Sequence, residues 1–209
     1  MDATQQNSDC FLCTPENDLI YHSDTAAFAL CGLGPIVEGY SVVATRNHAR
    51  SSADLTSVEG KEFQNFAVGV RSKLTSKFDS CLMTEHGRLP VCVDSSGTSE
   101  PHCYHAHFLF FPGAGDLGEN ARSYFRKTDV FDSLSTALES TRSLEEYYLY
   151  SPTPSRFLIM TRPGRLIRQF SRYLVAESLG QPELADWRRH PMRSEAVSMA
   201  QILRELFVG

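Results

Sequence analysis

The stretch His105-Ala-His107-Phe-Leu109-Phe-Phe-Pro112 decides how this sequence is interpreted. Its aromatic residues are typical of a β-strand, and Pro112 would end one. Alternate side chains of a strand share a face, so we expect His105, His107 and Leu109 to point the same way. Packing gives an apolar strand no reason to carry two histidines on one face. The pattern therefore predicts that the two imidazoles bind a ligand or react.

The composition sets outer limits on the class of protein. A chain of 209 residues with 42% apolar residues fits one folded domain with an ample core. A net charge of −5 argues against nucleic acid as a partner. No apolar run approaches the roughly 20 residues of a membrane helix, which argues against a membrane partner. The polar start of the chain does not resemble a signal peptide, so we expect a cytoplasmic protein whose six cysteines form no disulfides.

The pattern of apolar and turn-forming residues indicates both strands and helices along the chain. We expect residues 1–9 to be a flexible N-terminus, 10–125 the core and 126–209 the C-terminal extension. In the core, strands are expected over 19–22, 26–31, 39–45 and 81–85. A helix should begin near Thr56, because Thr56 and Glu59 match a capping box. In the extension we expect a helix over 130–138, strands over 146–150 and 156–160, a helix from Pro163 ending at Gly180, and a helix over 194–206.

Two cysteines near the start of the chain suggest a metal site. The spacing of Cys10-Phe-Leu-Cys13 lets two thiolates reach one tetrahedral ion. Zinc needs four nitrogen or sulfur ligands, and His48 and His105 are the candidates for the other two. A redox pair and two buried thiols without a function are the alternatives. Redox pairs normally open a helix after a strand, and nothing before Cys10 provides one.

His107 is the candidate nucleophile. Neutral imidazole attacks phosphorus and later leaves the phosphoramidate, which divides one displacement into two steps. This requires one ring nitrogen aimed at phosphorus and the other held by a carbonyl, with donors around the phosphoryl oxygens. The segment Ser96-Gly97-Thr98-Ser99 can supply those donors through its amides and hydroxyls. Two core histidines with satisfied hydrogen bonds are the alternative.

These residues together resemble the histidine-triad (HIT) superfamily of nucleotide hydrolases and transferases. His105 to Pro112 is similar to the pattern His-φ-His-φ-His-φ-φ followed by proline. The segment from Gly34-Pro35 to His48 is similar to the family segment that ends in histidine. Thr84-Glu85-His86-Gly87, Gln169-Phe-Ser-Arg172 and Asp186-Trp-Arg188 are similar to elements of a bacterial HIT-like subgroup. The likeness covers most of residues 10 to 190.

The resemblance carries specific expectations. It implies an α+β fold, in which a helix packs on an antiparallel sheet of about five strands and a mixed α/β C-terminal extension follows. It implies one structural zinc per chain held by Cys10, Cys13, His48 and His105, and a nucleotidyl-histidine intermediate at His107. It implies a homodimer, because HIT proteins form a two-subunit sheet. It favours contacts between a nucleotide, or another phosphorylated small molecule, and a set of residues that comprises Gly97, Thr98, Ser99, Gln169, Arg172 and Glu85.

The sequence also departs from the family pattern. Leu109 stands where the third triad histidine is expected. Gly32 stands where many members have an acidic or amide residue that binds the ribose hydroxyls, and Tyr40 stands where a histidine usually follows the glycine. A second register, with Cys103, His105 and His107 as the three positions, would make His105 the nucleophile. Pro112 favours the first register, because the family proline falls three residues after the last position.

Several polar residues allow two interpretations. Arg165, Arg168 and Arg172 at helical spacing either hold a phosphate or carboxylate or form a solvated face. Glu85 and His86 either assist proton transfer or form a structural pair. The sequence as a whole predicts a zinc-containing nucleotide hydrolase or nucleotidyltransferase. The rival interpretation is a zinc-braced binding protein that has lost turnover, with Leu109 and Gly32 as the marks of that loss.

Overall fold

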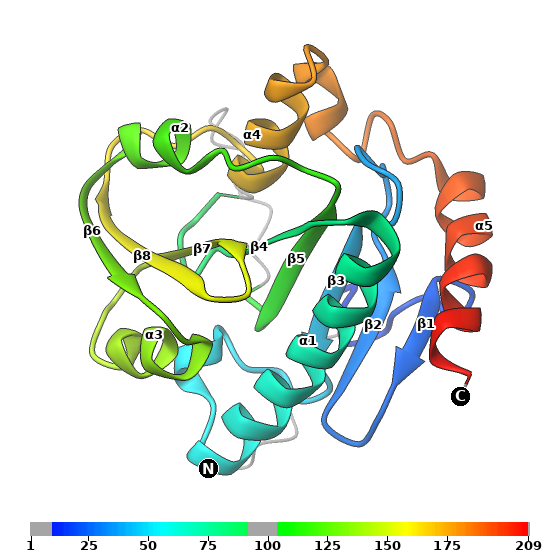
Figure 1. Ribbon diagram of the computed structural model, residues 1–209, viewed down its shortest axis with the longest axis horizontal. Coiled ribbons are helices and arrows are strands. Elements are labelled where there is room, and N and C mark those ends of the chain that lie inside the picture. The colour runs from blue at the N-terminus through cyan, green and yellow to red at the C-terminus, as the bar shows by residue number, and fades with distance from the viewer. Residues whose placement is uncertain (1–9, 92–103, 209) are drawn as a thin grey trace.

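The centre of the computed structural model, which describes residues 10–91 and 104–208, is an antiparallel sheet of eight strands (Figure 1). The order across the sheet is β1-β2-β3-β5-β4-β7-β8-β6. The strands are β1 Ile20–Ser23, β2 Ala27–Cys31, β3 Ser41–Thr45, β4 Cys81–Glu85, β5 His107–Pro112, β6 Phe125–Phe131, β7 Tyr148–Thr153 and β8 Arg156–Pro163. The predicted α+β class is confirmed.

The first five strands and one long helix form the half of the sheet that the sequence describes best. Helix α1 spans Ser57–Phe78 and crosses one face of the sheet, as Figure 1 shows. Its capping box is present: Thr56 accepts from the amide of Glu59, and the Glu59 carboxylate accepts from the amide of Thr56. Phe63 of the helix stacks on Phe108 of β5 with ring centroids 4.9 Å apart. This contact fixes α1 on the strand that carries His107.

The sheet has eight strands where about five were expected, because the extension adds three of its own. β7 pairs with β4, placing Thr84 opposite Tyr150, and β8 and β6 follow outward. The buried Arg71 of α1 joins the two parts by donating to the carbonyls of Cys81 on β4 and Ser151 on β7. Short helices α2 (Gly118–Ser123) and α3 (Leu134–Thr141) flank β6. Strands from both predicted segments of the chain therefore belong to one hydrogen-bonded sheet.

Two of the expected helices differ from the structure. The expected helix over 130–138 is replaced by the end of β6 and by α3, which begins only after Ser133 caps it. The helix expected from Pro163 to Gly180 begins later, as α4 at Phe170, since Pro163 closes β8 opposite Phe125 on β6. Proline suits the first turn of a helix and the end of a strand equally well, so the residue type did not distinguish them.

The C-terminal region covers two parts of the sheet. In this region α4 (Phe170–Ser178) is followed by the short 3₁₀ helix η2 (Pro182–Ala185). Earlier in the chain, another 3₁₀ helix, η1 (Ser52–Asp54), precedes α1. α5 (Arg193–Arg204) and η3 (Glu205–Phe207) pack beside β1, where Arg204 donates to the carbonyls of Ile20 and Asp18. The outer strands of the sheet are β1 and β6. The two-subunit sheet predicted from the resemblance would have to join through one of these two edges.

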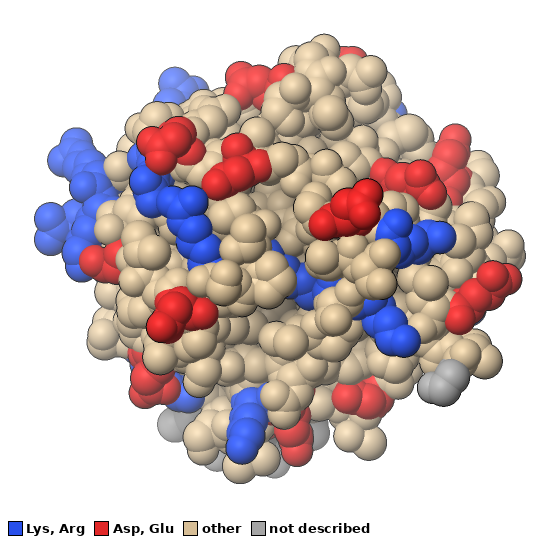
Figure 2. Space-filling view, viewed as in Figure 1, with Lys and Arg blue, Asp and Glu red and all other residues tan. Residues whose placement is uncertain are grey.

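The surface agrees with the charge balance of the sequence. Figure 2 shows Lys and Arg interspersed with Asp and Glu over the face in view. Among the helices of the described residues, none combines the length and apolar character needed to span a bilayer. The four cysteines in this part of the chain, Cys10, Cys13, Cys31 and Cys81, take part in no disulfide.

Candidate metal and active site

Four side chains from three distant segments converge on one point. The Sγ atom of Cys10 lies 3.4 Å from Nδ1 of His105, and Sγ of Cys13 lies 3.1 Å from Nδ1 of His48 and 3.7 Å from Nδ1 of His105. One ligand atom from each of the four residues lies within 4.8 Å of all the others. These are the four residues that the sequence analysis named as metal ligands.

The donor set fits zinc. With zinc–sulfur bonds near 2.3 Å and zinc–nitrogen bonds near 2.0–2.1 Å, the edges of a tetrahedral site are roughly 3.3–3.8 Å long. The observed sulfur–nitrogen distances fall in or close to that range. Nε2 of His105 lies 2.8 Å from the carbonyl oxygen of Thr45, so the second nitrogen of this ring donates to the backbone. This is the outer contact that orients a metal-binding histidine and leaves its other nitrogen for the ion.

Local backbone contacts hold these ligands in place. The amide of Cys13 donates to the carbonyl of Cys10, which closes the Cys-x-x-Cys segment into a turn with both sulfurs on one side. The amide of Ala106 donates to the carbonyl of Ala49, which lies directly after His48. The loop that carries His48 is thereby fixed to the segment that carries His105.

His107 is the first residue of β5 and is half-buried. Its Nδ1 atom lies 2.5 Å from the carbonyl oxygen of His105. Because a carbonyl can only accept, Nδ1 carries the proton, and the lone pair of the neutral ring belongs to Nε2. The carbonyl that fixes this tautomer belongs to a predicted metal ligand. The position of the His107 ring therefore depends on the segment held at the four-residue cluster.

The expected strand begins later than the sequence indicated. β5 starts at His107, so His105 lies in the irregular segment before it and does not share the strand face with His107 and Leu109. His105 is buried and turns toward the cysteines, while His107 turns toward His86. Hydrogen bonds between residue 106 and Thr45 and Ala49 bend the chain at this point. The rings of the candidate metal ligand His105 and the candidate nucleophile His107 therefore point to different partners.

His86 lies across from His107 at the end of β4. Thr84 pairs with Leu109 in the ladder, and two residues further along the strands the rings of His86 and His107 stand edge to face with centroids 6.3 Å apart. Nε2 of His86 lies 2.9 Å from the hydroxyl of Ser171 at the start of α4. The neighbouring Glu85 has other partners, the amide of Ser52 and the hydroxyl of Tyr147.

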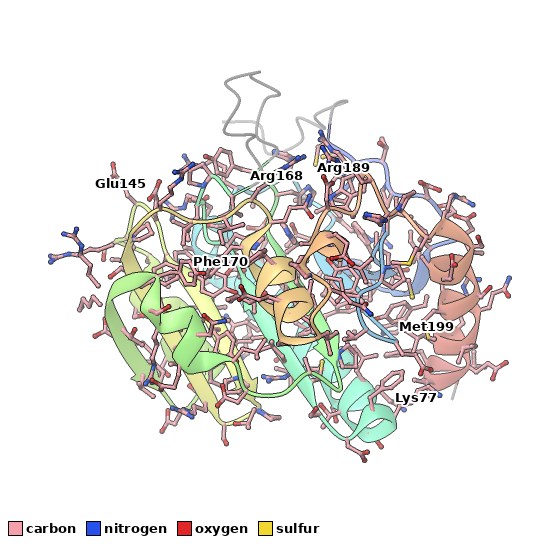
Figure 3. All side chains as sticks on the ribbon, turned by 90° about the horizontal axis from the view of Figure 1, so that it is seen from above. Lys77, Glu145, Arg168, Phe170, Arg189 and Met199 are labelled. Atoms are coloured by element: carbon pink, nitrogen blue, oxygen red, sulfur yellow. The ribbon has the colours of Figure 1, made fainter. Side chains whose placement is uncertain are left out.

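Ser171 connects three elements beneath α4. Its hydroxyl oxygen lies 2.9 Å from Oγ1 of Thr84, from the hydroxyl of Tyr148 and from Nε2 of His86. Phe170, which is fully buried, packs edge-on against Tyr148 and anchors the first turn of the helix (Figure 3). Ser171 and Tyr148 could not be singled out from the sequence, since a serine and a tyrosine far apart in the chain give no local signal of contact.

At Gly32 and Leu109, where the sequence departs from the HIT pattern, side chains of this protein occupy the space. A Cβ atom at Gly32 would stand 2.2 Å from Cε1 of Tyr40, so the tyrosine ring occupies the space beside the glycine. The guanidinium of Arg172 stacks over that ring, 5.0 Å from its centroid. The ring of Tyr40 therefore fits only because residue 32 has no side chain. Leu109 is buried between β3 and β4, opposite Val42 and Thr84.

Arg172, which was predicted to contact substrate, makes hydrogen bonds to the backbone in this structure. It is 4% exposed and donates to the carbonyl oxygens of four residues: Leu33, Gly34, Leu184 and Ala185. A guanidinium has five donors, and this one uses its three nitrogens on the backbone. Arg172 thus ties α4 to η2 and to the loop after β2. Arg165 and Arg168 precede α4, so the expected helical row of three arginines does not form.

Gln169 precedes the first residue of α4 in a left-handed conformation, with φ of 54°. Its amide donates to the carbonyl of Val91, and its carbonyl accepts from the amide of Tyr173. The side chain is 6% exposed, and its Oε1 atom has no hydrogen-bond partner among the described residues. Gly97, Thr98 and Ser99, the predicted donors to phosphate, lie outside the described residues.

Glu85, the last residue of β4, is buried. Its carboxylate accepts from the amide of Ser52 at 2.8 Å and from the hydroxyl of Tyr147 at 2.8 Å. Burial raises the pKa of Glu85 to about 7, although these two hydrogen bonds and the charge of Arg88 oppose the rise. The contacts hold β4 to the η1 turn that follows the His48 loop. These two contacts are structural, and neither of them connects the Glu85 carboxylate to His107.

The raised pKa of Glu85 makes folding stability depend on pH. Between about pH 4.5 and 7 the folded protein keeps a proton that the unfolded chain releases, so stability falls as pH rises and levels off above pH 7. The shift corresponds to roughly 3 kcal/mol. We expect Glu85→Gln, which keeps a partner for Ser52 and for Tyr147, to gain about that much relative to the native chain between pH 5 and pH 8.

Urea unfolding of both proteins at the two pH values measures this effect. Taking the difference between the proteins removes the contribution of every other titrating group. A difference that stays constant between pH 5 and pH 8 would contradict the assignment.

Comparisons with known proteins give weak likenesses. No family model matches the sequence, and no curated protein matches it significantly. A Hit-like protein involved in cell-cycle regulation from Bartonella henselae has 13% identity and a TM-score of 0.39, covering 53% of this chain and 82% of that one. A HIT family hydrolase from Clostridium thermocellum has 12% identity and a TM-score of 0.37, covering 51% and 92%.

A further solved structure spans more of the chain. Yeast Ap4A phosphorylase Apa2, in complex with AMP, has 13% identity and a TM-score of 0.42, and the likeness covers 74% of this chain and 64% of that one. Values of this size do not establish a family or an activity for this chain. The functional proposal therefore depends on the geometry of the site together with the sequence motifs.

Proposed function

We propose that this protein is a zinc-containing nucleotide hydrolase or nucleotidyltransferase that works through a nucleotidyl-histidine intermediate at His107. The supporting observation is the hydrogen bond from Nδ1 of His107 to the carbonyl of His105. This hydrogen bond keeps the proton of the His107 ring on Nδ1 and leaves the lone pair on Nε2 for attack. His105 itself belongs to the four-residue cluster. The sequence resemblance to HIT proteins supplies the substrate class, a phosphorylated small molecule.

The first step is a displacement at phosphorus. The Nε2 lone pair of His107 forms a bond to the phosphorus atom of the nucleotide, and the bond from phosphorus to the leaving oxygen or nitrogen breaks. The leaving group departs with the bonding electrons and takes a proton from solvent. In the second step water or another acceptor attacks the same phosphorus atom, and the bond to Nε2 breaks. The acceptor loses its proton, and the neutral imidazole is restored.

The metal would be structural in this scheme. Cys10, Cys13, His48 and His105 would supply all four positions of a tetrahedral zinc, and a closed site of that kind stabilises a fold without binding substrate. When bound, zinc fixes the relative positions of the chain segments that carry these residues. His105 then presents its carbonyl oxygen to Nδ1 of His107.

A binding protein without turnover is the second candidate. Two observations favour it: Leu109 replaces a potential phosphate contact, and Tyr40 fills the space beside Gly32. Arg172, which could have contacted an anion, donates to backbone carbonyls. On this alternative the cluster still braces the site, and a nucleotide binds without forming an adduct.

Turnover of labelled substrates separates the two candidates. The zinc-loaded protein is incubated with dinucleoside polyphosphates and nucleoside phosphoramidates labelled at the transferred phosphorus, then denatured in base, where phosphohistidine survives. A labelled adduct that maps to the peptide containing His107, together with release of nucleoside monophosphate, is expected. Tight binding without adduct or turnover would replace the enzyme with the binding protein. An adduct on His105 would reassign the nucleophile.

The homodimer and the cytoplasmic location belong to this proposal as well. The dimer follows from the sequence resemblance, and its shared sheet would use β1 or β6. The location follows from the polar start of the sequence and the expected absence of disulfides. Sedimentation of the purified protein at micromolar concentration measures the first of these.

A further inference from the structure

Strand β6 is one of the two outer strands of the sheet, and its outer edge is open. Within the described residues β6 pairs with β8 alone, so the backbone groups that point away from β8 meet no further strand. In Figure 1 this strand forms the left outline of the molecule, between α2 and α3. An open strand edge is a template for pairing with another strand. The side chains of β6 therefore determine which strand can pair with it.

The other outer edge offers a poorer surface. β1 has only four residues, and its register is irregular between Ile20 and His22. Arg204 of α5 donates to the carbonyls of Ile20 and Asp18, so the C-terminal helix already uses backbone groups of this region. β6 has seven residues and keeps one register with β8 throughout. Of the two edges, β6 is the longer and the more accessible.

The sequence of β6, Phe125-Arg-Lys-Thr-Asp-Val-Phe131, complements itself. Consider two copies of the strand that run antiparallel about a two-fold axis at Thr128. Lys127 of each copy then lies opposite Asp129 of the other, and Phe125 lies opposite Phe131. Opposite charges and pairs of aromatic rings at directly facing positions stabilise strand pairs. The strand therefore fits a second copy of itself.

The same charges oppose the neighbouring registers. A two-fold axis at Lys127 would set two lysines face to face, and an axis at Asp129 would set two aspartates face to face. Like charges at directly facing positions are destabilising. Charged residues on an edge usually prevent indiscriminate pairing, and here their alternating sign leaves one favourable register. The pattern is that of a specific contact between two copies.

The side chains that would meet are accessible. The side chains of Lys127 and Asp129 are 57% and 44% exposed, and Nζ of the lysine lies 2.8 Å from Oδ2 of the aspartate. In the pair of strands each of these charges gains a second partner of opposite sign. Val130 is exposed and would face Arg126 of the other copy, whose aliphatic stem can cover it.

We propose that β6 is the surface through which two copies of this chain join into one continuous sheet, with the two-fold axis at Thr128. The proposal rests on the homodimer of the proposed function and adds its edge, its register and its paired residues. It requires neither the zinc nor the chemistry at His107. The pair of strands contains few apolar side chains, so the dissociation constant is expected to be of micromolar order.

Charge reversals test the pairing by sedimentation. Lys127→Asp and Asp129→Lys each set like charges face to face twice in the dimer, so each should weaken dimerisation by about tenfold or more. An equimolar mixture of the two variants restores opposite charges, and the mixed dimer should form with nearly native affinity. Lys61→Asp and Glu62→Lys on the exposed face of α1 are the matched controls. They change the charge equally and should leave dimerisation as it is.

A cross-link tests the register. In the proposed pair the two copies of residue 128 face each other with Cα atoms about 4.5–5.5 Å apart, a separation that a disulfide spans. Thr128→Cys should therefore give a covalent dimer under mild oxidation. Val130→Cys is the control, because its two copies would lie about 13 Å apart along the strands, beyond the reach of a disulfide. Electrophoresis without reductant, with the native chain treated in parallel, measures both.

The outcomes separate this inference from the wider proposal. A dimer that ignores both charge reversals would overturn the pairing through β6 and leave the homodimer itself in place on another surface. A mixture that dimerises no better than the single variants would also overturn it. A chain that stays monomeric at millimolar concentration would remove the homodimer and the inference together. The adduct experiment at His107 decides the reaction whichever of these results is obtained.

Discussion

His107→Asn is expected to lower turnover of nucleotide substrates by about 10⁴-fold or more, which is the scale seen when a covalent nucleophile is removed. The asparagine amide can still donate to the carbonyl of His105, so the hydrogen bond at Nδ1 has a substitute. What the variant lacks is a ring nitrogen that can form a bond to phosphorus. The labelled adduct should disappear together with turnover. Single-turnover kinetics and adduct trapping measure the two effects side by side.

Two controls make this result specific to chemistry. The variant should keep its zinc content and its thermal stability, because His107 is half-buried and lies outside the four-residue cluster. Substrate affinity, measured at equilibrium, should change little. Turnover within tenfold of the native protein would show that His107 is not the nucleophile, and an unchanged adduct would move the role to another residue.

Cys13→Ser is expected to remove the metal and a large part of the folding stability. A structural zinc contributes several kcal/mol through binding to the folded chain alone. For a chain of this length, each 1 kcal/mol shifts the melting temperature by about 2–4 °C. Zinc content should therefore fall from one ion per chain to nearly none, and the melting temperature should drop by about 10 °C or more. Metal analysis and calorimetry measure the two quantities.

Cys31→Ala is the matched control for loss of a thiol. Cys31 is buried in β2, and burial raises the pKa of its thiol to about 12, so it stays protonated and is no metal ligand. This variant should keep one zinc per chain. His48→Ala should behave like Cys13→Ser. Retention of zinc by Cys13→Ser would remove the cluster from the proposed function, and the role of His107 would then have to stand without it.

The core half of the fold was predictable because its signals are local. The capping box at Thr56 depends on two residues three apart, and the structure contains it. The strand at 81–85 was confirmed as β4 with the same limits. The four predicted ligands lie together, and no local rule alone could have selected His48 and His105. Their selection came from the order of short motifs along the chain, which is the sequence likeness to HIT proteins.

The extension was less predictable because its contacts are distant in sequence. Nothing near Tyr148 indicates that β7 will pair with β4, since pairing depends on a strand more than 60 residues earlier. Arg172 has the residue type of an anion contact, yet its neighbours in space are carbonyls of two other loops. A helical spacing cannot reveal this, because it gives the face of a helix and not what covers that face.

The four-residue cluster joins parts of the chain that are far apart in sequence, since Cys10 and His105 are 95 positions apart. Closing so long a loop costs entropy, and β1, β2 and β3 lie between its ends. We therefore expect the proposed ion to bind late in folding, after the transition state. An interaction formed that late leaves the rate of folding nearly unchanged and slows the rate of unfolding. The metal would thus raise the kinetic stability of the protein, because it would slow unfolding once the native topology has formed.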